Sequence, residues 1–314
     1  MDSPDVFERP RCNPTQYHES FPMSKFSHYQ TAIKTAFYCN QKAIKSKLGI
    51  RGRPRFRVTQ YGIDYAVERY ARVCRTLLEH IPDPNALQGA VASEIGCGDC
   101  YASADMMLGL GARHVHLVEF QPLELIEDDR RVLHAIAGDS TLPNNGELFT
   151  AGDPLRLDPQ KATYHRGYLE NIKLPEKVDF LYSFDVLEHV EDLDGFFAYC
   201  GEVVRPGGMM VHKFDLTGHS LYEDPMPPLD FLTYPRWLFN IIFPKYWRAA
   251  GNFADEFIAA MEKHGFIDLK VIPIRVAEPE YLDEIWPHLM ARARSRDKEI
   301  VKLLDLVIVA TRQA

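Results

Sequence analysis

Val91-Ala92-Ser93-Glu94-Ile95-Gly96-Cys97-Gly98 is the stretch of the chain that decides its fold. It is an apolar run that ends in two spaced glycines, and Val115-His116-Leu117-Val118-Glu119 follows, with its acid about 20 residues downstream. A buried strand, a glycine turn and an acid at the end of the next strand are the parts from which an α/β sheet builds a nucleoside site. We therefore expect such a sheet, with a binding edge at this turn.

The composition is that of an ordinary globular protein, with 46% hydrophobic and 25% charged residues among 314. Lys and Arg number 36 against 44 Asp and Glu, and the net charge of −8 disfavours a general attraction to nucleic acid or to an anionic membrane. No apolar stretch reaches the roughly 18 to 20 residues that span a bilayer, and the polar start is unlike a signal peptide. We expect a cytoplasmic protein with no nucleic-acid or membrane partner, and a homodimer is left open.

Strand and helix patterns alternate from residue 90 onward, which indicates a mainly parallel sheet. Before it, apolar residues at helical spacing predict helices in 25–47 and 61–81. Residues 1–85 are therefore predicted to form a helical N-terminal extension and 86–314 the main domain, with insertions at about 138–160, a loop or hairpin, and 218–253. Strands are expected at 90–95, 114–119, 163–166, 178–184, 209–214, 267–274 and 303–311, and helices at 101–110, 123–136, 193–204, 254–264 and 279–293.

Three motifs in this order and spacing resemble those of the class I S-adenosylmethionine-dependent methyltransferases. They are the glycine stretch 94–100, with Cys100 in place of a third glycine, then Val178-Asp179-Phe180-Leu181-Tyr182-Ser183-Phe184-Asp185-Val186-Leu187-Glu188-His189-Val190, then Val203-Val204-Arg205-Pro206-Gly207-Gly208-Met209-Met210-Val211. The resemblance implies a Rossmann-like, doubly wound sheet of seven mainly parallel strands with an antiparallel last strand. The insertion at 218–253 is expected to form a lid after strand five. It also implies S-adenosylmethionine as cofactor and S-adenosylhomocysteine as product.

The resemblance implies cofactor-binding residues, each of which meets a physical need. Gly96 and Gly98 let the backbone approach the methionine part of the cofactor. Glu119 is placed to accept two hydrogen bonds from the ribose hydroxyls, and Tyr168 or Leu169 to pack on the adenine. The further candidates from the same motifs are Glu94, Cys97, Phe120, Phe184 and Asp185.

A hydroxyl acceptor needs a base, and histidine is the commonest base at neutral pH. We prefer His219 as the base with Asp215 as its orienting acid, because both follow the fifth strand. His189 and His212 are the other catalytic candidates, the first also readable as a residue that orients a loop and the second as a core histidine. No metal site is predicted; a divalent ion held by Asp185, Asp215 and His219 is the alternative.

Acceptor selection is expected in residues 221–253, whose aromatic side chains could line a pocket or pack the insertion onto the sheet. The sequence predicts a methyltransferase for a small molecule, with O-methylation of a sugar, a polysaccharide precursor or a secondary metabolite preferred. An N- or C-methyltransferase of a small metabolite is one alternative, and a non-catalytic S-adenosylmethionine-binding protein is another. A nicotinamide-dependent oxidoreductase is disfavoured, because Tyr101 stands where its third glycine would be.

Overall fold

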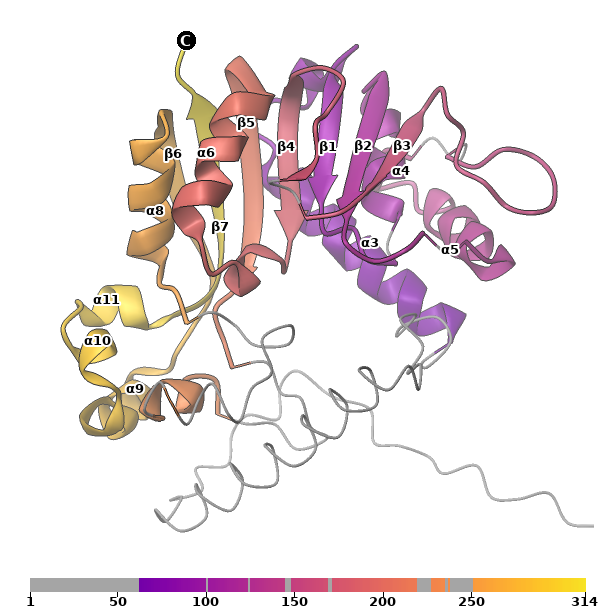
Figure 1. Ribbon diagram of the computed structural model, residues 1–314. Helices are drawn as coiled ribbons and strands as arrows, with labels where there is room; N and C mark the ends of the chain where they lie inside the picture. The colour runs from indigo at the N-terminus through magenta and orange to yellow at the C-terminus, as the bar shows by residue number, and fades with distance from the viewer. Residues whose placement is uncertain are drawn as a thin grey trace, which may run out of the picture.

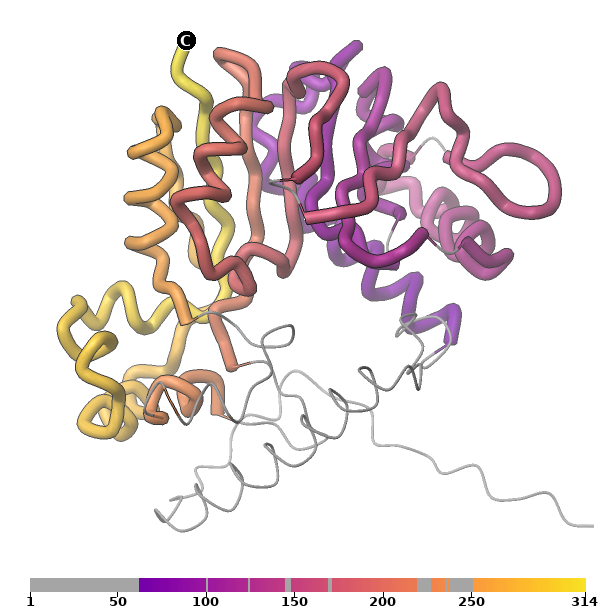
Figure 2. The backbone as a smooth tube through the Cα atoms, in the orientation of Figure 1, coloured from indigo at the N-terminus to yellow at the C-terminus, as the bar shows by residue number. Residues whose placement is uncertain are grey.

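A seven-stranded sheet lies at the centre of the molecule, in the strand order β3-β2-β1-β4-β5-β7-β6 (Figures 1 and 2). The structure is a computed structural model that describes residues 62–99, 101–123, 125–144, 148–168, 171–218, 227–234, 237 and 251–314. The strands are β1 (Val91–Ile95), β2 (His114–Glu119), β3 (Ala162–Arg166), β4 (Val178–Phe184), β5 (Val204–Asp215), β6 (Phe266–Val276) and β7 (Leu303–Arg312). Neighbouring strands from β3 through β2, β1 and β4 to β5 are parallel, and β7 is antiparallel to both β5 and β6. This arrangement confirms the predicted Rossmann-like, doubly wound sheet.

Helices cover both faces of the sheet (Figure 1). Residues of α3 (Ile63–His80), α4 (Ala102–Gly109) and α5 (Glu127–Ala137) form one core with the sheet, and residues of α6 (Leu193–Val203) and α8 (Ala254–Lys263) form the core on the other side. The short helical segments are η1 (Pro84–Leu87), η3 (Leu187–His189), η4 (Asp230–Thr233), α9 (Pro279–Ile285), η5 (Trp286–His288), α10 (Ala291–Arg294) and α11 (Lys298–Val301). The two helical layers explain why all five residues of β1 are buried, since a strand covered on both faces has no solvent side.

Helix α3, in the predicted N-terminal extension, shares its core with the sheet. Its Tyr70 and Leu77 are buried in the same cluster as Ala92 of β1 and Phe180 of β4. The apolar residues of α3 recur at helical spacing because one face of the helix lies on the sheet. The helix predicted at 25–47 lies outside the described residues.

Three predicted segments differ in the structure. The helix expected at 279–293 is broken into α9, η5 and α10, because Pro287 cannot donate to a continuing α-helix. The strand expected at 209–214 begins at Val204, with a register shift in its pairing to β4. The insertion at 138–160 contains one antiparallel bridge, Phe149 to Leu157, in its described part.

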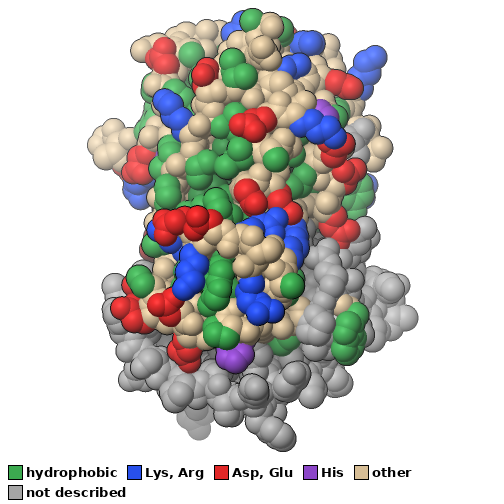
Figure 3. All heavy atoms as spheres, turned by 90° about the vertical axis from the view of Figure 1, so that its left-hand side faces the viewer, with side chains coloured by type: hydrophobic (Ala, Val, Ile, Leu, Met, Phe, Trp, Pro, Cys, Tyr) green, Lys and Arg blue, Asp and Glu red, His purple; other side chains and the backbone are tan. Residues whose placement is uncertain are grey.

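The edge strand β6 faces the viewer in Figure 3, where hydrophobic surface lies among charged side chains. Its exposed hydrophobic residues are Ile267, Ile274 and Val276. Irregular register with β7 and the proline at 273 interrupt the regularity of this edge, which is how natural sheets avoid pairing with other chains. Within the part of the chain that the structure describes, no helix combines the length and the apolar character needed to cross a membrane.

Candidate functional site

The glycine turn after β1 lies at the carboxyl edge of the sheet, where ligands of open α/β sheets bind. Gly96 and Gly98 have φ values of 71° and 56°, which side chains rarely adopt. A Cβ on Gly96 would lie 2.5 Å from Val186 Cγ2, whereas a Cβ on Gly98 would meet no atom within 4 Å. Gly96 is therefore required by packing against the segment after β4, and Gly98 is the glycine with open space beside it.

Glu119 ends β2 and is held by the backbone on both sides of its carboxylate. Its Oε2 accepts from Gly98 N at 3.0 Å and its Oε1 accepts from Gln121 N at 3.1 Å. Each carboxylate oxygen can accept a further hydrogen bond. The group is thus oriented at the edge of the sheet with acceptor capacity to spare, which fits the two hydroxyls of a ribose.

Two aromatic rings lie near this carboxylate. Phe120 follows Glu119 in the chain, and Tyr168 follows the end of β3. Phe120 and Tyr168 are 49% and 50% exposed, and their rings are parallel to within 4° with centroids 5.9 Å apart. Exposed flat apolar surface of this kind suits a purine base. The predicted neighbour Leu169 lies outside the described residues.

Glu94 and Cys97 are predicted cofactor residues whose side chains the structure places in the interior. Both carboxylate oxygens of Glu94 accept from Ser103 Oγ at 2.8 Å, and Oε2 also accepts from the Tyr182 hydroxyl at 3.2 Å. Burial raises the pKa of Glu94 to about 8. The carboxyl group of Glu94 thus joins β1 to α4 and β4, and the Cys97 thiol is buried beside the turn.

Alternating charges join the strand ends on the other half of the edge. Lys213 Nζ of β5 donates to Asp185 Oδ1 at 2.5 Å and to Asp305 Oδ1 of β7 at 2.7 Å, and lies 5.2 Å from the centre of the Phe184 ring. Arg275 Nε of β6 donates to Asp305 Oδ2 at 2.5 Å. The structure therefore places the predicted residues Phe184 and Asp185 together, and ties them to a lysine.

Sequence reasoning missed Lys213, Asp305 and Arg275. The members of this network are far apart in the chain, and only the strand order brings them together. One signal was available, because Lys213 lies in a strand pattern with apolar residues on both sides of His212-Lys213, and a buried ammonium needs an anionic partner.

The predicted histidines lie in different surroundings. His212 is fully buried, with its Nδ1 hydrogen-bonded to Ser183 Oγ at 2.8 Å, and burial lowers its pKa to about 3. It is a neutral core histidine, and the structure does not bring it to the open edge. His189 is partly buried in η3, just after the end of β4, while His219 lies outside the described residues.

The acids beside these histidines are held in different ways. Asp215 Oδ1 accepts from Thr217 N at 3.0 Å and from Thr217 Oγ1 at 2.6 Å, which forms a tight turn at the end of β5. Glu188 is buried, and its pKa is raised well above the usual range by burial and then by the negative charge of Asp185. Among the described residues, no group of three His, Cys, Asp or Glu is arranged to hold a metal ion.

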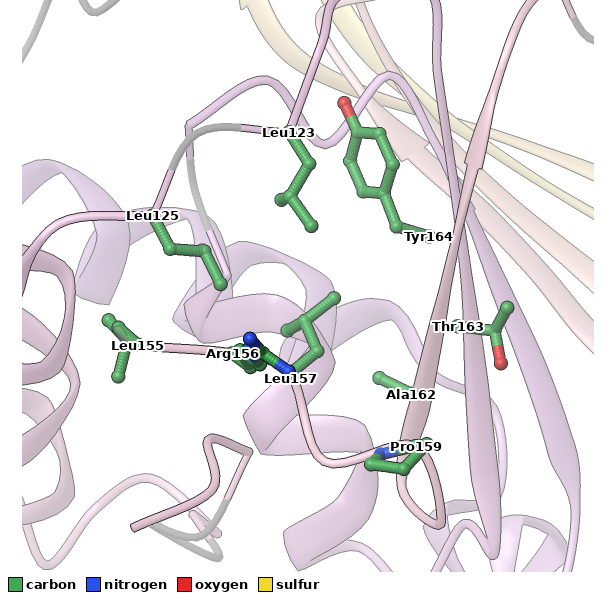
Figure 4. A pocket seen from close by; sticks show the side chains of 9 residues that line it. All are labelled: Leu123, Leu125, Leu155, Arg156, Leu157, Pro159, Ala162, Thr163 and Tyr164. Carbon is green, nitrogen blue, oxygen red and sulfur yellow. The ribbon is translucent and has the colours of Figure 1, made fainter. Parts of the chain in front are cut away.

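A cavity of about 370 Å³ opens beside β3 (Figure 4). In Figure 4 its leucine side chains surround the space while the hydroxyl of Tyr164 points away, and that hydroxyl donates to Gln121 O at 2.8 Å. The lining comes from the segment after β2, from the 138–160 insertion and from β3: Leu123, Leu125, Leu155, Arg156, Leu157, Pro159, Ala162, Thr163 and Tyr164. The cavity is thus on the β3 side of Glu119, away from β5.

Comparison with known proteins gives one family match. Residues 150–212 match the family described as "Methyltransferase domain". One curated relative, the ubiquinone biosynthesis O-methyltransferase of Mesorhizobium japonicum, is 51% identical over 35 residues, which are 11% of this chain and 14% of that protein. The match to the curated relative therefore spans about a seventh of its length.

Solved structures are similar at low identity. An S-adenosylmethionine-dependent methyltransferase from Mesorhizobium loti is 19% identical, with 80% of this chain and 100% of that chain covered at a TM-score of 0.45. Phosphoethanolamine N-methyltransferase 2 of Haemonchus contortus, in complex with S-adenosylmethionine, is 14% identical, with 84% and 61% covered at a TM-score of 0.47.

The family match and the strand order together confirm the resemblance found in the sequence. Residues 150–212 thus match a methyltransferase domain, and they lie within a sheet of the kind that the resemblance implies.

Proposed function

We propose that this methyltransferase domain transfers a methyl group from S-adenosylmethionine to an oxygen atom of a small molecule. The observation that carries the cofactor part of the proposal is the Glu119 carboxylate, oriented by Gly98 N and Gln121 N beside the exposed rings of Phe120 and Tyr168. An acceptor pair for ribose hydroxyls next to a flat apolar surface for adenine suits a nucleoside without phosphates.

The cofactor, when bound, supplies a methyl group on a positively charged sulfur. Displacement at that carbon needs a nucleophile held in line and a site that excludes water. We propose that Glu119 and Gly98 position the cofactor, and that Phe184 and Asp185 at the end of β4 form the adjoining wall. Glu94 and Cys97 then support the site from inside the core, by fixing the turn and α4.

A hydroxyl acceptor must lose its proton as the new bond forms. We propose His219 as the base and Asp215 as its orienting acid. The turn that Thr217 makes on Asp215 supports this assignment, because it fixes the carboxylate at the end of β5, in the segment that leads to His219. His189 of η3 is the second candidate, since it follows the end of β4.

The acceptor class is proposed as a sugar, a polysaccharide precursor or a secondary metabolite. The short match to a ubiquinone biosynthesis O-methyltransferase supports an oxygen acceptor. The aromatic insertion within 218–253 is proposed to select the acceptor; its described members Phe231 and Tyr234 are buried, whereas Trp237 is 65% exposed. We place the reaction in the cytoplasm, because the net charge and the sequence indicate neither a nucleic-acid nor a membrane partner.

Replacement of Glu119 by alanine tests the cofactor site. We expect the affinity for S-adenosylhomocysteine to fall about 10- to 100-fold in isothermal titration calorimetry, because charge-assisted hydrogen bonds are lost. Glu127→Ala is the matched control, since Glu127 is an exposed acid on α5. An unchanged affinity in Glu119→Ala contradicts the ribose assignment, and binding of NAD in place of S-adenosylhomocysteine contradicts the cofactor.

Mass spectrometry tests the reaction. We expect a metabolite extract incubated with methyl-labelled S-adenosylmethionine to yield a labelled product whose methyl group is on oxygen. With that acceptor, His219→Ala is expected to lower kcat by about 10²- to 10⁴-fold without weakening S-adenosylmethionine binding, while His134→Ala, at an exposed position of α5, keeps normal turnover. Loss of turnover in His189→Ala but not in His219→Ala would move the base to η3, and a product methylated on nitrogen or carbon would refute the O-methyl proposal.

A further inference from the structure

Lys213 is a buried cation near the carboxyl end of β5, in the part of the strand that is buried. It is 8% exposed, and its neighbours His212 and Phe214 are fully buried. An isolated ammonium in such a place would be strongly destabilising, and an ion pair restores stability only with good geometry. Burial would lower the pKa of Lys213, but the carboxylates of Asp185 and Asp305 raise it above its usual value, so the side chain stays charged.

Lys213 holds Asp185 at two points. Its backbone carbonyl accepts from Asp185 N at 3.1 Å, and its Nζ donates to Asp185 Oδ1 at 2.5 Å. Asp185 has a φ of 56°, a left-handed conformation that costs a residue other than glycine roughly 1–3 kcal/mol and persists only where the surroundings impose it. The two contacts with Lys213 are the described interactions best placed to impose it.

Asp185 in turn sets the position of Val186, the next residue. Val186 packs against the turn after β1, where a Cβ on Gly96 would lie 2.5 Å from Val186 Cγ2. Gly98 N, two residues further along the same turn, donates to Glu119. A continuous set of contacts therefore leads from Lys213 through Asp185 and Val186 to the turn that holds the ribose carboxylate.

The other end of the network anchors Lys213. Asp305 Oδ1 accepts from Lys213 Nζ at 2.7 Å, and Asp305 Oδ2 accepts from Arg275 Nε at 2.5 Å. On the side of α3, Arg69 lies 3.9 Å from Asp185 Oδ2. The Lys213 ammonium thus lies between the carboxylates of Asp185 and Asp305, and each of these has an arginine close by.

We propose that Lys213 is a positioning residue of the cofactor site, which acts by holding Asp185 in its left-handed conformation and thereby the glycine turn against Val186. The proposal rests on the proposed function of that turn. Lys213 is itself buried, and its proposed effect is on the position of the glycine turn.

Lys213→Met is the principal test, because methionine keeps the length and removes the charge. We expect the affinity for S-adenosylhomocysteine to fall about tenfold at a temperature where circular dichroism shows the protein folded. We also expect amide hydrogen exchange to be faster in the variant than in the wild type for peptides covering 94–99 and 183–187. Exchange in peptides of α8 is expected to stay the same. Lys263→Met is the matched control, since Lys263 pairs with Asp194 on the exposed surface, and both measurements should be unchanged.

A double variant separates positioning from stability. Lys213→Met leaves Asp305 without its lysine, and Asp305→Asn in the same chain is expected to recover part of the melting temperature but not the affinity, since Asp185 still lacks the hydrogen bond from the ammonium. Recovery of the affinity together with the melting temperature, or unchanged affinity and exchange in Lys213→Met, would overturn the proposal.

Two further outcomes keep the test decisive. Should Lys213→Met not fold, Asp185→Asn removes the charge of the pair with little change in shape, and the same rise in exchange at 94–99 is expected. If the wild-type chain binds no S-adenosylhomocysteine, the proposed function fails, while hydrogen exchange at 94–99 still decides whether Lys213 positions the turn.

Discussion

Two buried glutamates at the ends of neighbouring strands have different surroundings. Glu119 accepts from backbone N–H groups at the edge of the sheet, and Glu94 accepts from the hydroxyls of Ser103 and Tyr182 in the core. The residues that flank Glu94 and Glu119 in the sequence do not show that one lies at the edge of the sheet and the other in the core. The difference decides their chemistry, because the pKa of Glu94 is raised to about 8 by burial.

The titration of Glu94 predicts a pH dependence of stability. Its pKa is about 8 in the folded chain against a reference value of 4.5, so between these values the folded state holds a proton that the unfolded state has lost. The stability from this group is present below pH 4.5 and is lost as the pH rises to 8, by at most about 1.4 kcal/mol per pH unit.

Glu94→Gln removes this titration while it keeps the shape of the side chain. The free energy of unfolding of the variant minus that of the wild type is therefore expected to rise between about pH 5 and pH 8, as measured by urea unfolding at several pH values. A difference that stays constant across this range would show that Glu94 does not hold its proton in the folded protein.

At the scale of elements, the turn after β1 depends on the segment after β4. Gly96→Ala is expected to destabilise the chain by two causes, a left-handed residue and a clash with Val186, each roughly 1–3 kcal/mol. Gly98→Ala is the matched control and carries only the first cause, because no atom lies within 4 Å of its added Cβ.

The measurement is urea unfolding of the two single variants and of Gly96→Ala combined with Val186→Ala. We expect the double variant to be more stable than the sum of its parts predicts, by about 0.5–3 kcal/mol, because the smaller side chain relieves the clash. Strict additivity would mean that the turn and the β4 segment are not in the contact described.

At the scale of the whole molecule, ion pairs join the ends of four neighbouring strands at one edge of the sheet. The network from Asp185 through Lys213 and Asp305 to Arg275 crosses β4, β5, β7 and β6, and α3 approaches it through Arg69. Helix α3 also shares a core with the sheet. The boundary predicted at residue 85 remains a prediction, and the packing shows that α3 lies on the sheet of the following domain.

The sequence by itself determined the sheet and which residues end its strands at the carboxyl edge. β2 and β4 begin and end at the predicted residues, because an apolar strand between turns is a local pattern. Phe120 and Tyr168 lie side by side because the parallel strands β2 and β3 end at one edge, while their role and that of Glu119 in binding stay predictions. The motif that contains Asp185 was also recognisable, because its residues are contiguous in the chain.

Only the tertiary structure decided how these residues are held. Lys213 and Asp305 are 92 positions apart, and no local pattern pairs them. The packing of Gly96 on Val186, the interior position of Glu94 and the buried pairing of His212 with Ser183 likewise depend on contacts between separate strands. Strand formation follows from nearby residues, whereas burial and ion pairing depend on which strands become neighbours in the folded sheet.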